Sequence, residues 1–180
     1  RRHTRYISVT GVQTCALPIY ELAAAAGVSL AHVKPHGALY NQAVYDERIA
    51  RAVVEGVRAH TPAIAVFAPP ESALLRAAGD AGLRGVREAF ADRSYQANGR
   101  LVPRSQPGAV ITDQAAVVER ARRLVLEGTL TAASGEVVAV PCDTICVHAD
   151  TPGAAALARA IRDDLMRAGV RVGPPRVDRT

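Results

Sequence analysis

The sequence predicts an α/β fold built on a parallel sheet, and two observations lead to this prediction. Short apolar runs alternate with amphipathic stretches over most of the 180 residues, at roughly thirty residues per strand–helix unit, which is typical of β–α–β units. Polar residues gather where the apolar runs end, as they do at the carboxyl edge of parallel sheets. An open sheet and a piece of a closed (β/α) barrel both fit this pattern.

The strands are expected in short runs of apolar and β-branched residues that are bounded by Gly, Pro or charged residues. These runs are residues 30–33, 63–67, 85–90, 136–140, 144–147 and 170–172. The runs at 30–33, 63–67 and 144–147 are mostly apolar, so we expect them to be buried.

The helices are expected where apolar residues recur every three or four positions between a capping residue and a glycine. They cover residues 20–26, 38–43, 47–59, 72–78, 114–127 and 154–168. Asp46 and Asp113 are predicted N-caps, because a carboxylate at that position accepts hydrogen bonds from the N–H groups of the first turn. Gly27, Gly128 and Gly169 are expected to end three of the helices.

Residues 1–19 differ from the rest of the chain, because they contain no acidic residue and have no helical or strand periodicity. Residues 9–19 and 1–5 resemble the translation of a common sequencing adapter and of the upstream end of its primer. We therefore expect residues 1–19 to lie outside the fold, residues 20–173 to form one domain and residues 174–180 to be a frayed tail. The alternative is a genuine basic tail or a targeting peptide. We also expect the native protein to extend upstream of Tyr20.

Composition excludes several classes of protein. Without the three arginines of residues 1–19, the chain has 19 basic residues rather than 22 against 17 acidic ones, a balance that does not indicate nucleic-acid binding. Only 4% of residues are aromatic, which also disfavours a single-strand binder, and no apolar run is long enough to cross a membrane. Cys142 and Cys146 are too few for a disulfide framework, so we expect buried thiols and a cytoplasmic protein.

The segment from Val33 to Asn41 is the centre of the predicted site. Pro35 ends the first strand and Gly37 allows a sharp turn into a helix, so Lys34 and His36 lie at the carboxyl end of a strand. Lys34 is the only lysine of the chain. The alternative is that Lys34 merely ends the strand and His36 bonds nearby backbone.

Residues 91–108 form a long polar stretch, which in a compact domain is usually functional or disordered. Its residues Asp92, Arg93, Tyr95 and Arg104 favour a function, and a solvated excursion is the alternative. Asn98-Gly99 predicts a hairpin with a type I′ turn.

Polar side chains follow three of the predicted strands. They are Lys34 and His36, then Glu88, Asp92 and Arg93, then His148 and Asp150. Because the carboxyl ends of parallel strands meet at one edge, such a set can polarise a carbonyl, move protons and orient a carboxylate or phosphate. His and Asp could also bind a metal, but no tight ligand spacing such as H-x-x-x-H occurs, and we predict no protein-bound metal.

Four blocks of the chain resemble the signature blocks of the LamB/YcsF family. They are residues 34–41 (KPHGALYN), 90–95 (FADRSY), 101–109 (LVPRSQPGA) and 143–148 (DTICVH). They occur in the family's order, and the resemblance extends over residues 20–172.

The resemblance implies an irregular, TIM-like (β/α) barrel related to sugar deacetylases, of which residues 20–173 would be the C-terminal part, without the N-terminal strands. It implies ATP-dependent opening of the 5-oxoproline lactam to L-glutamate, with ATP bound as its magnesium complex and with 5-oxoprolinase subunits B and C as partners. The expected catalytic residues are Lys34, His36, Asp92, His148 and Asp150. The expected substrate- and phosphate-binding residues are Tyr40, Asn41, Glu88, Arg93, Tyr95 and Arg104.

The chain departs from the family pattern at residues 68–72 (APPES), at Ala149 and at Asn98. The family's acidic first strand and its early histidine motifs lie upstream of Tyr20, so we expect this chain alone to be unstable and inactive. Two alternatives stay open: a metal-dependent amide or sugar deacetylase on the same barrel, and a non-catalytic structural subunit.

Overall fold

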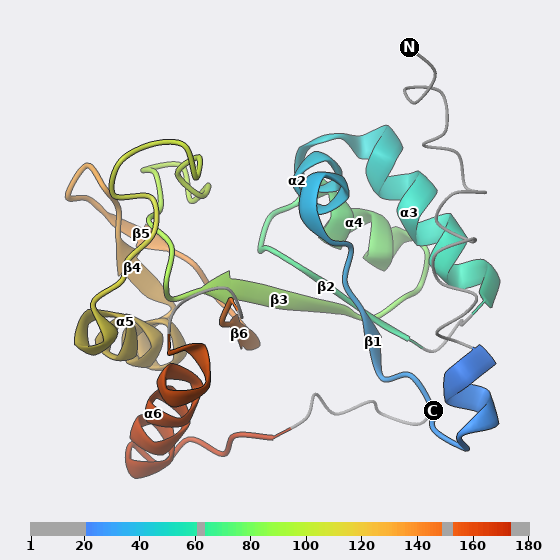
Figure 1. The fold of residues 1–180 in the computed structure, drawn as a ribbon. Coiled ribbons are helices and arrows are strands. Elements are labelled where there is room, and N and C mark those ends of the chain that lie inside the picture. Colours follow the sequence, from blue (N-terminus) through green and yellow to red (C-terminus); the bar gives the residue numbers. More distant parts are fainter. Residues whose placement is uncertain (1–20, 61–63, 149–152, 174–180) are drawn as a thin grey trace. The chain divides into compact units, whose positions relative to one another are not determined.

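The computed structural model describes residues 21–60, 64–148 and 153–173. The described residues divide into two compact units, one within residues 21–87 and the other within residues 88–173 (Figure 1). Each unit contains parallel strands and the helices that cover them, so the predicted alternation of strands and helices is confirmed. In the part of the chain that the structure describes, no helix is long and apolar enough to cross a membrane.

The strands of the first unit run parallel. β1 (His32–Val33) pairs with β2 (Ala65–Ala68), and β2 pairs with the first half of β3 (Gly85–Phe90). All four residues of β2 are buried, as predicted. The prediction of a buried strand at residues 30–33 is wrong, because His32 is exposed and Val33 is only half-buried. The reason is that β1, among the described residues, has a neighbour on one side only.

Three helices pack together in the first unit: α2 (Gly37–Tyr45), α3 (Glu47–His60) and α4 (Ala73–Asp80) (Figure 1). Asp46 caps α3 as predicted, since its Oδ1 accepts from the backbone N–H groups of Arg48 and Ile49 at 2.8 and 3.2 Å. The helices bury an aliphatic core whose largest fully buried members are Val53, Val54, Val66 and Leu74. Burial of each such side chain contributes about 2 kcal/mol.

The second unit combines a parallel pair with an antiparallel hairpin. The second half of β3 pairs with β6 (Thr144–Cys146), and β4 (Thr129–Thr131) pairs with β5 (Val137–Ala139). α5 (Gln114–Glu127) and α6 (Ala154–Arg167) pack on one another (Figure 1). Asp113 caps α5 as predicted, and Gly128 ends it with a φ of 66°.

Three expectations for the second unit are wrong. No strand was expected at β4, which closes the hairpin with β5. β6 was expected to be buried, but its residues are only half-buried, because β3 is its one neighbour among the described strands. Residues 170–172 are not a strand, since the Val170 N–H donates to the Leu165 carbonyl at the end of α6 instead.

Candidate functional site

Asp92 and His148 are two of the predicted site residues, and their side chains contact one another directly. Each follows one of two neighbouring parallel strands by two positions, because β3 ends at Phe90 and β6 at Cys146, and these two residues are register partners. The His148 Nδ1 and the Asp92 Oδ2 are 2.7 Å apart. The parallel sheet therefore brings together two groups that lie 56 positions apart in the sequence.

The strand register defines the face of β3 that carries Phe90. Side chains alternate between the two faces of a strand, so Glu88 and Phe90 share a face and lie beside their register partners Thr144 and Cys146. The ring of Phe90 stacks on that of His148, with centroids 5.6 Å apart and an angle of 20° between the planes. Glu88 is buried on this face. The imidazole is thus held by a ring on one side and by a carboxylate at Nδ1.

The two members of the pair differ in their access to solvent. The Asp92 side chain is 1% exposed and that of His148 is 22% exposed. An ionised carboxylate only accepts hydrogen bonds, so with Asp92 in that form the His148 Nδ1 is the donor of this contact and Nε2 is left as the nitrogen that can accept a proton. Among the described residues, the Asp92 Oδ1 is the buried side-chain oxygen without a hydrogen-bond partner. A carboxylate–imidazole pair of this kind can act as a general base or transfer a proton.

The backbone around Asp92 is fixed by contacts from outside the strand. The Ile111 N–H donates to the Asp92 carbonyl at 2.9 Å. Arg120 of α5 donates from Nε to the Ala91 carbonyl at 2.9 Å and from Nη2 to the Arg93 carbonyl at 2.7 Å. The carbonyls of three successive residues are therefore bonded, and the segment that carries Asp92 is held on both sides.

Arg93 lies inside the long polar segment rather than at its surface. Its side chain is buried, and it donates from Nε to the Ala109 carbonyl at 3.1 Å and from Nη2 to the Val102 carbonyl at 2.6 Å. Burial lowers the pKa of Arg93, and the nearby charge of Arg104 lowers it further. These contacts tie the two ends of the segment together, while the exposed Arg104 lies between them in sequence.

Tyr95 holds the end of β3. Its hydroxyl accepts a hydrogen bond from the Phe90 N–H at 2.9 Å, and the ring is 3% exposed. Burial raises the pKa of Tyr95 above its usual range, so the phenol stays neutral. Tyr95 thus supports Phe90, whose ring in turn stacks on His148.

Residues 91–108 form an ordered loop that is closed by backbone pairing. Tyr95 and Leu101 form an antiparallel bridge, and the Ser94 N–H donates to the Ala109 carbonyl at 3.0 Å. The predicted hairpin is confirmed, but the type I′ turn is wrong. That turn needs positive φ at Asn98 and Gly99, and of the two only Gly99 has it, at 76°. The Gln96 N–H reaches the Arg100 carbonyl, so the loop has three residues and ends on a left-handed glycine.

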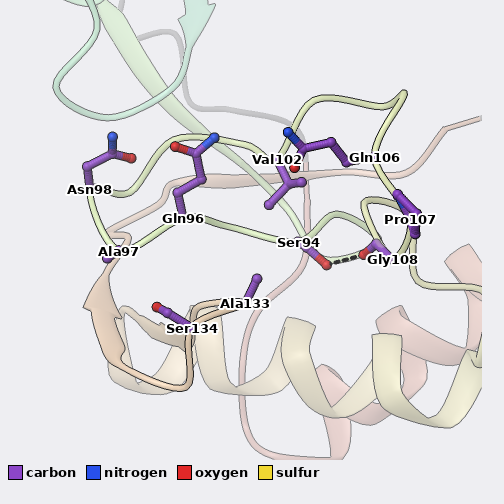
Figure 2. A pocket seen from close by; sticks show the side chains of 10 residues that line it. All are labelled: Ser94, Gln96, Ala97, Asn98, Val102, Gln106, Pro107, Gly108, Ala133 and Ser134. Atoms are coloured by element: carbon purple, nitrogen blue, oxygen red, sulfur yellow. Dashed lines mark hydrogen bonds between the residues drawn. The ribbon is translucent and has the colours of Figure 1, made fainter.

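This loop and the β4–β5 turn line a cavity of about 600 Å³ (Figure 2). The lining consists of Ser94, Gln96, Ala97, Asn98, Val102, Gln106, Pro107, Gly108, Ala133 and Ser134. Ser94 is turned toward the Gly108 carbonyl, to which its hydroxyl donates (Figure 2). The lining contains no ionisable side chain, so the cavity suits an uncharged polar group better than a phosphate.

The predicted site residues of the first unit follow β1. Lys34 is half-buried and lies with its Nζ 5.2 Å from the ring centroid of the buried Tyr40, a cation–π contact. His36 is the N-cap residue of α2, but its side chain makes no capping hydrogen bond and is exposed. Asn41 is also exposed, in the first half of α2. Gly37 has a φ of 61°, as the sharp turn after Pro35 requires.

Three further predictions concern Asp150, the cysteines and metal binding. Asp150 lies outside the described residues. Cys142 and Cys146 are not joined in a disulfide, and they are half-buried rather than buried. In the described ranges, no three side chains of the His, Cys, Asp and Glu types are grouped in a way that could hold a metal ion.

Sequence reasoning missed two residues that support the pair. Phe90 could have been found, because it follows Glu88 by two positions in β3 and therefore shares a face of the strand with it. Arg120 gives no such signal, since it is one of several arginines on α5 and its partners lie 27 and 29 positions away.

Comparisons with known proteins agree with the resemblance. A model of the LamB/YcsF family matches residues 6–179. A Streptomyces coelicolor protein that is named as the A subunit of 5-oxoprolinase is 55% identical over 151 residues, which are 84% of this chain and 60% of that protein. The protein of the same name from Symbiobacterium thermophilum is 51% identical over 154 residues, 86% of this chain and 59% of that protein.

A solved structure is also similar. The crystal structure of a lactam utilization protein from Thermus thermophilus matches with a TM-score of 0.85 and 42% sequence identity, over 95% of this chain and 70% of that chain. The likeness confirms the predicted α/β fold of the partial-barrel type. The chain spans about 60% of the length of the curated relatives that it matches.

Proposed function

Because this chain belongs to the LamB/YcsF family, we propose that it is part of the A subunit of a 5-oxoprolinase. In this proposal the whole protein works in the cytoplasm with subunits B and C, and the complex uses ATP to open the 5-oxoproline lactam to L-glutamate. Relatives that are named as 5-oxoprolinase A subunits and are at least 51% identical support it. The name of the Thermus protein, a lactam utilization protein, points to the same substrate class.

The chemistry needs an activated carbonyl, because direct attack of water on a lactam is slow. Transfer of the γ-phosphoryl group of ATP to the lactam oxygen makes the carbonyl carbon more electrophilic and releases ADP. Water then adds to that carbon, and cleavage of the C–N bond gives γ-glutamyl phosphate. A second water molecule hydrolyses this acyl phosphate to L-glutamate and inorganic phosphate. The protein must bind phosphate and must take a proton from the attacking water.

The contact between Asp92 and His148 is the observation that carries the proposal at the level of residues. With Asp92 bound to Nδ1, the His148 Nε2 can accept the proton of the attacking water. The stacked ring of Phe90 limits rotation of the imidazole. The pair thus has the oriented base that hydrolysis of the activated lactam requires.

The cations differ in how well they suit a phosphate. Two nitrogens of the Arg93 guanidinium donate to backbone carbonyls of its own loop. As the cations for phosphate we propose the half-buried Lys34 and the exposed Arg104, each described within its own unit. The magnesium ion would arrive with ATP and neutralise phosphate charge.

The test is oxoproline-dependent release of ADP by the protein that carries this chain, assembled with its partner subunits. Asp92→Asn and His148→Ala should each lower kcat by about 10²- to 10⁴-fold, the usual contribution of an oriented acid or base. Asp163→Asn, which changes an exposed carboxylate on α6 of the same unit, is the matched control and should retain wild-type turnover.

Three outcomes would contradict the proposal. Full activity of both variants in an assembled complex would favour a structural subunit. Hydrolysis of amides without ATP, lost on addition of a chelator, would favour a metal-dependent deacetylase. Absence of any oxoproline-dependent ADP release by the wild-type complex would remove the assignment altogether.

A further inference from the structure

Arg120 contacts the backbone on both sides of Asp92, and it does so from a different element of the second unit. It lies on α5, half-buried, and its Nε and Nη2 donate to the carbonyls of Ala91 and Arg93 at 2.9 and 2.7 Å. These two carbonyls flank Asp92 on either side in the sequence. One guanidinium group therefore forms hydrogen bonds with the backbone immediately before and immediately after Asp92, whose carboxylate contacts His148.

The geometry of a guanidinium makes this contact restrictive. Its N–H groups form a rigid planar fork, so two carbonyls can be bonded at once only if they converge on one plane. The segment at Asp92 must turn to present both carbonyls to Arg120, while the Asp92 carbonyl itself accepts from the Ile111 N–H. The backbone that sets the direction of the Asp92 side chain is thus fixed at three successive carbonyls.

Arg120 differs from its neighbours on the same helix. Arg122 pairs with Asp164 of α6 at 3.7 Å, and Arg123 pairs with Glu127 at 3.1 Å, both as surface ion pairs. Burial lowers the pKa of Arg120, and the charge of Arg123 lowers it further, whereas Tyr95 and Asp92 act in the opposite direction.

We propose that Arg120 is a positioning residue for the Asp92–His148 pair. By holding the carbonyls of Ala91 and Arg93 it keeps the Asp92 Oδ2 within reach of the His148 Nδ1, and so keeps the imidazole in the tautomer whose Nε2 accepts a proton. Its effect on turnover rests on the proposed function. Its effect on the tautomer of His148 does not.

The first measurement is independent of turnover. The ¹⁵N chemical shifts of histidine side chains distinguish the Nδ1–H tautomer from the Nε2–H tautomer, and we expect Nδ1–H for His148 in the wild-type protein. Asp92→Asn should disturb this tautomer, and Arg120→Lys and Arg120→Ala should disturb it in the same direction. Arg122→Lys, an exposed arginine of the same helix, is the control and should leave the spectrum of His148 unchanged.

The second measurement is a double-mutant cycle on kcat. We expect Arg120→Lys to lower kcat by at least tenfold in the wild-type background, with KM for 5-oxoproline changed less than twofold, and to change kcat by less than twofold in the Asp92→Asn background. Such non-additivity shows action through Asp92, whereas a general loss of structure would lower kcat equally in both backgrounds.

The outcomes separate the two proposals. Thermal denaturation is used to show that the Arg120→Lys and Arg120→Ala variants are folded. If these folded variants keep the Nδ1–H tautomer of His148, the positioning role is overturned. If the wild-type His148 is not in the Nδ1–H tautomer, it is overturned as well. If the variants change the tautomer but Asp92→Asn leaves turnover unchanged, the positioning role stands and the catalytic role of the dyad fails.

Discussion

The segments that follow β1 and β3 both contain predicted site residues, but they use them differently. After β1, His36 is exposed and makes no capping bond although it begins α2, and Lys34 lies over the ring of Tyr40. After β3, Arg93 and Tyr95 are buried, and the side chains of both form hydrogen bonds with backbone groups of the same unit.

This difference shows that a signature block can serve two purposes. In the block at residues 90–95, Asp92 contacts His148 directly, Phe90 stacks on it, and Arg93 and Tyr95 hold the loop and the strand end. Resemblance to a family marks all of these positions alike, because structure and chemistry both constrain sequence. Only the contacts separate the residue that can react from the residues that hold it.

The largest effect on stability is expected for Arg93→Ala. Removal of the guanidinium leaves the carbonyls of Ala109 and Val102 without their buried donors, which should lower the free energy of unfolding by about 3 kcal/mol. Urea denaturation measures it. Arg104→Ala, an exposed arginine of the same loop, should change the free energy of unfolding by less than about 0.5 kcal/mol. Equal effects would contradict a structural role for Arg93.

A smaller effect is expected for Tyr95→Phe, which leaves the Phe90 N–H without its acceptor. The free energy of unfolding should fall by about 1–2 kcal/mol at neutral pH. Burial raises the pKa of Tyr95 above its ordinary value of 10.0, so the folded state keeps a proton that the unfolded chain loses. This contribution is complete below pH 10.0 and is lost as the pH rises above it.

The measurement for Tyr95 is the dependence of stability on pH. Urea denaturation of the wild-type protein between pH 8 and 11 should show a decline that steepens above the ordinary tyrosine pKa. The part of this decline that Tyr95 causes should be absent from the Tyr95→Phe variant. A variant that declines as steeply as the wild type would place the alkaline titration elsewhere.

Sequence reasoning was accurate where local chemistry decides the structure. The bounds of β3 and α5 and the caps Asp46 and Asp113 follow from periodicity and capping preferences alone. Topology extends this reach to distant residues. Asp92 and His148 could be grouped because both follow strands of a parallel sheet.

Sequence reasoning failed where the structure depends on a contact between distant residues or on a small difference in backbone conformation. The partners of Arg120 are carbonyls, which any residue supplies, so no pattern marks it. The turn at Asn98-Gly99 depends on whether the loop has two or three residues, and both fit the same dipeptide. The burial of β1 and β6 depends on their neighbours in the sheet rather than on their own composition.

The smallest effect on stability is expected for His36→Ala in the segment after β1. The side chain is exposed and makes no capping bond, so the free energy of unfolding should change by less than about 0.5 kcal/mol. The chemistry of an imidazole at a strand end makes His36 a predicted catalytic residue, so oxoproline-dependent ADP release should fall at least tenfold in the same variant. Stability and turnover are measured on one preparation, and Gln42→Ala, a change of an exposed residue of the same helix, is the control.

If the His36→Ala variant had wild-type turnover and wild-type stability, His36 would have neither a catalytic nor a structural role. A variant that unfolds more easily would give the segment after β1 the supporting role that Arg93 and Tyr95 have after β3, and the difference between the two segments would disappear.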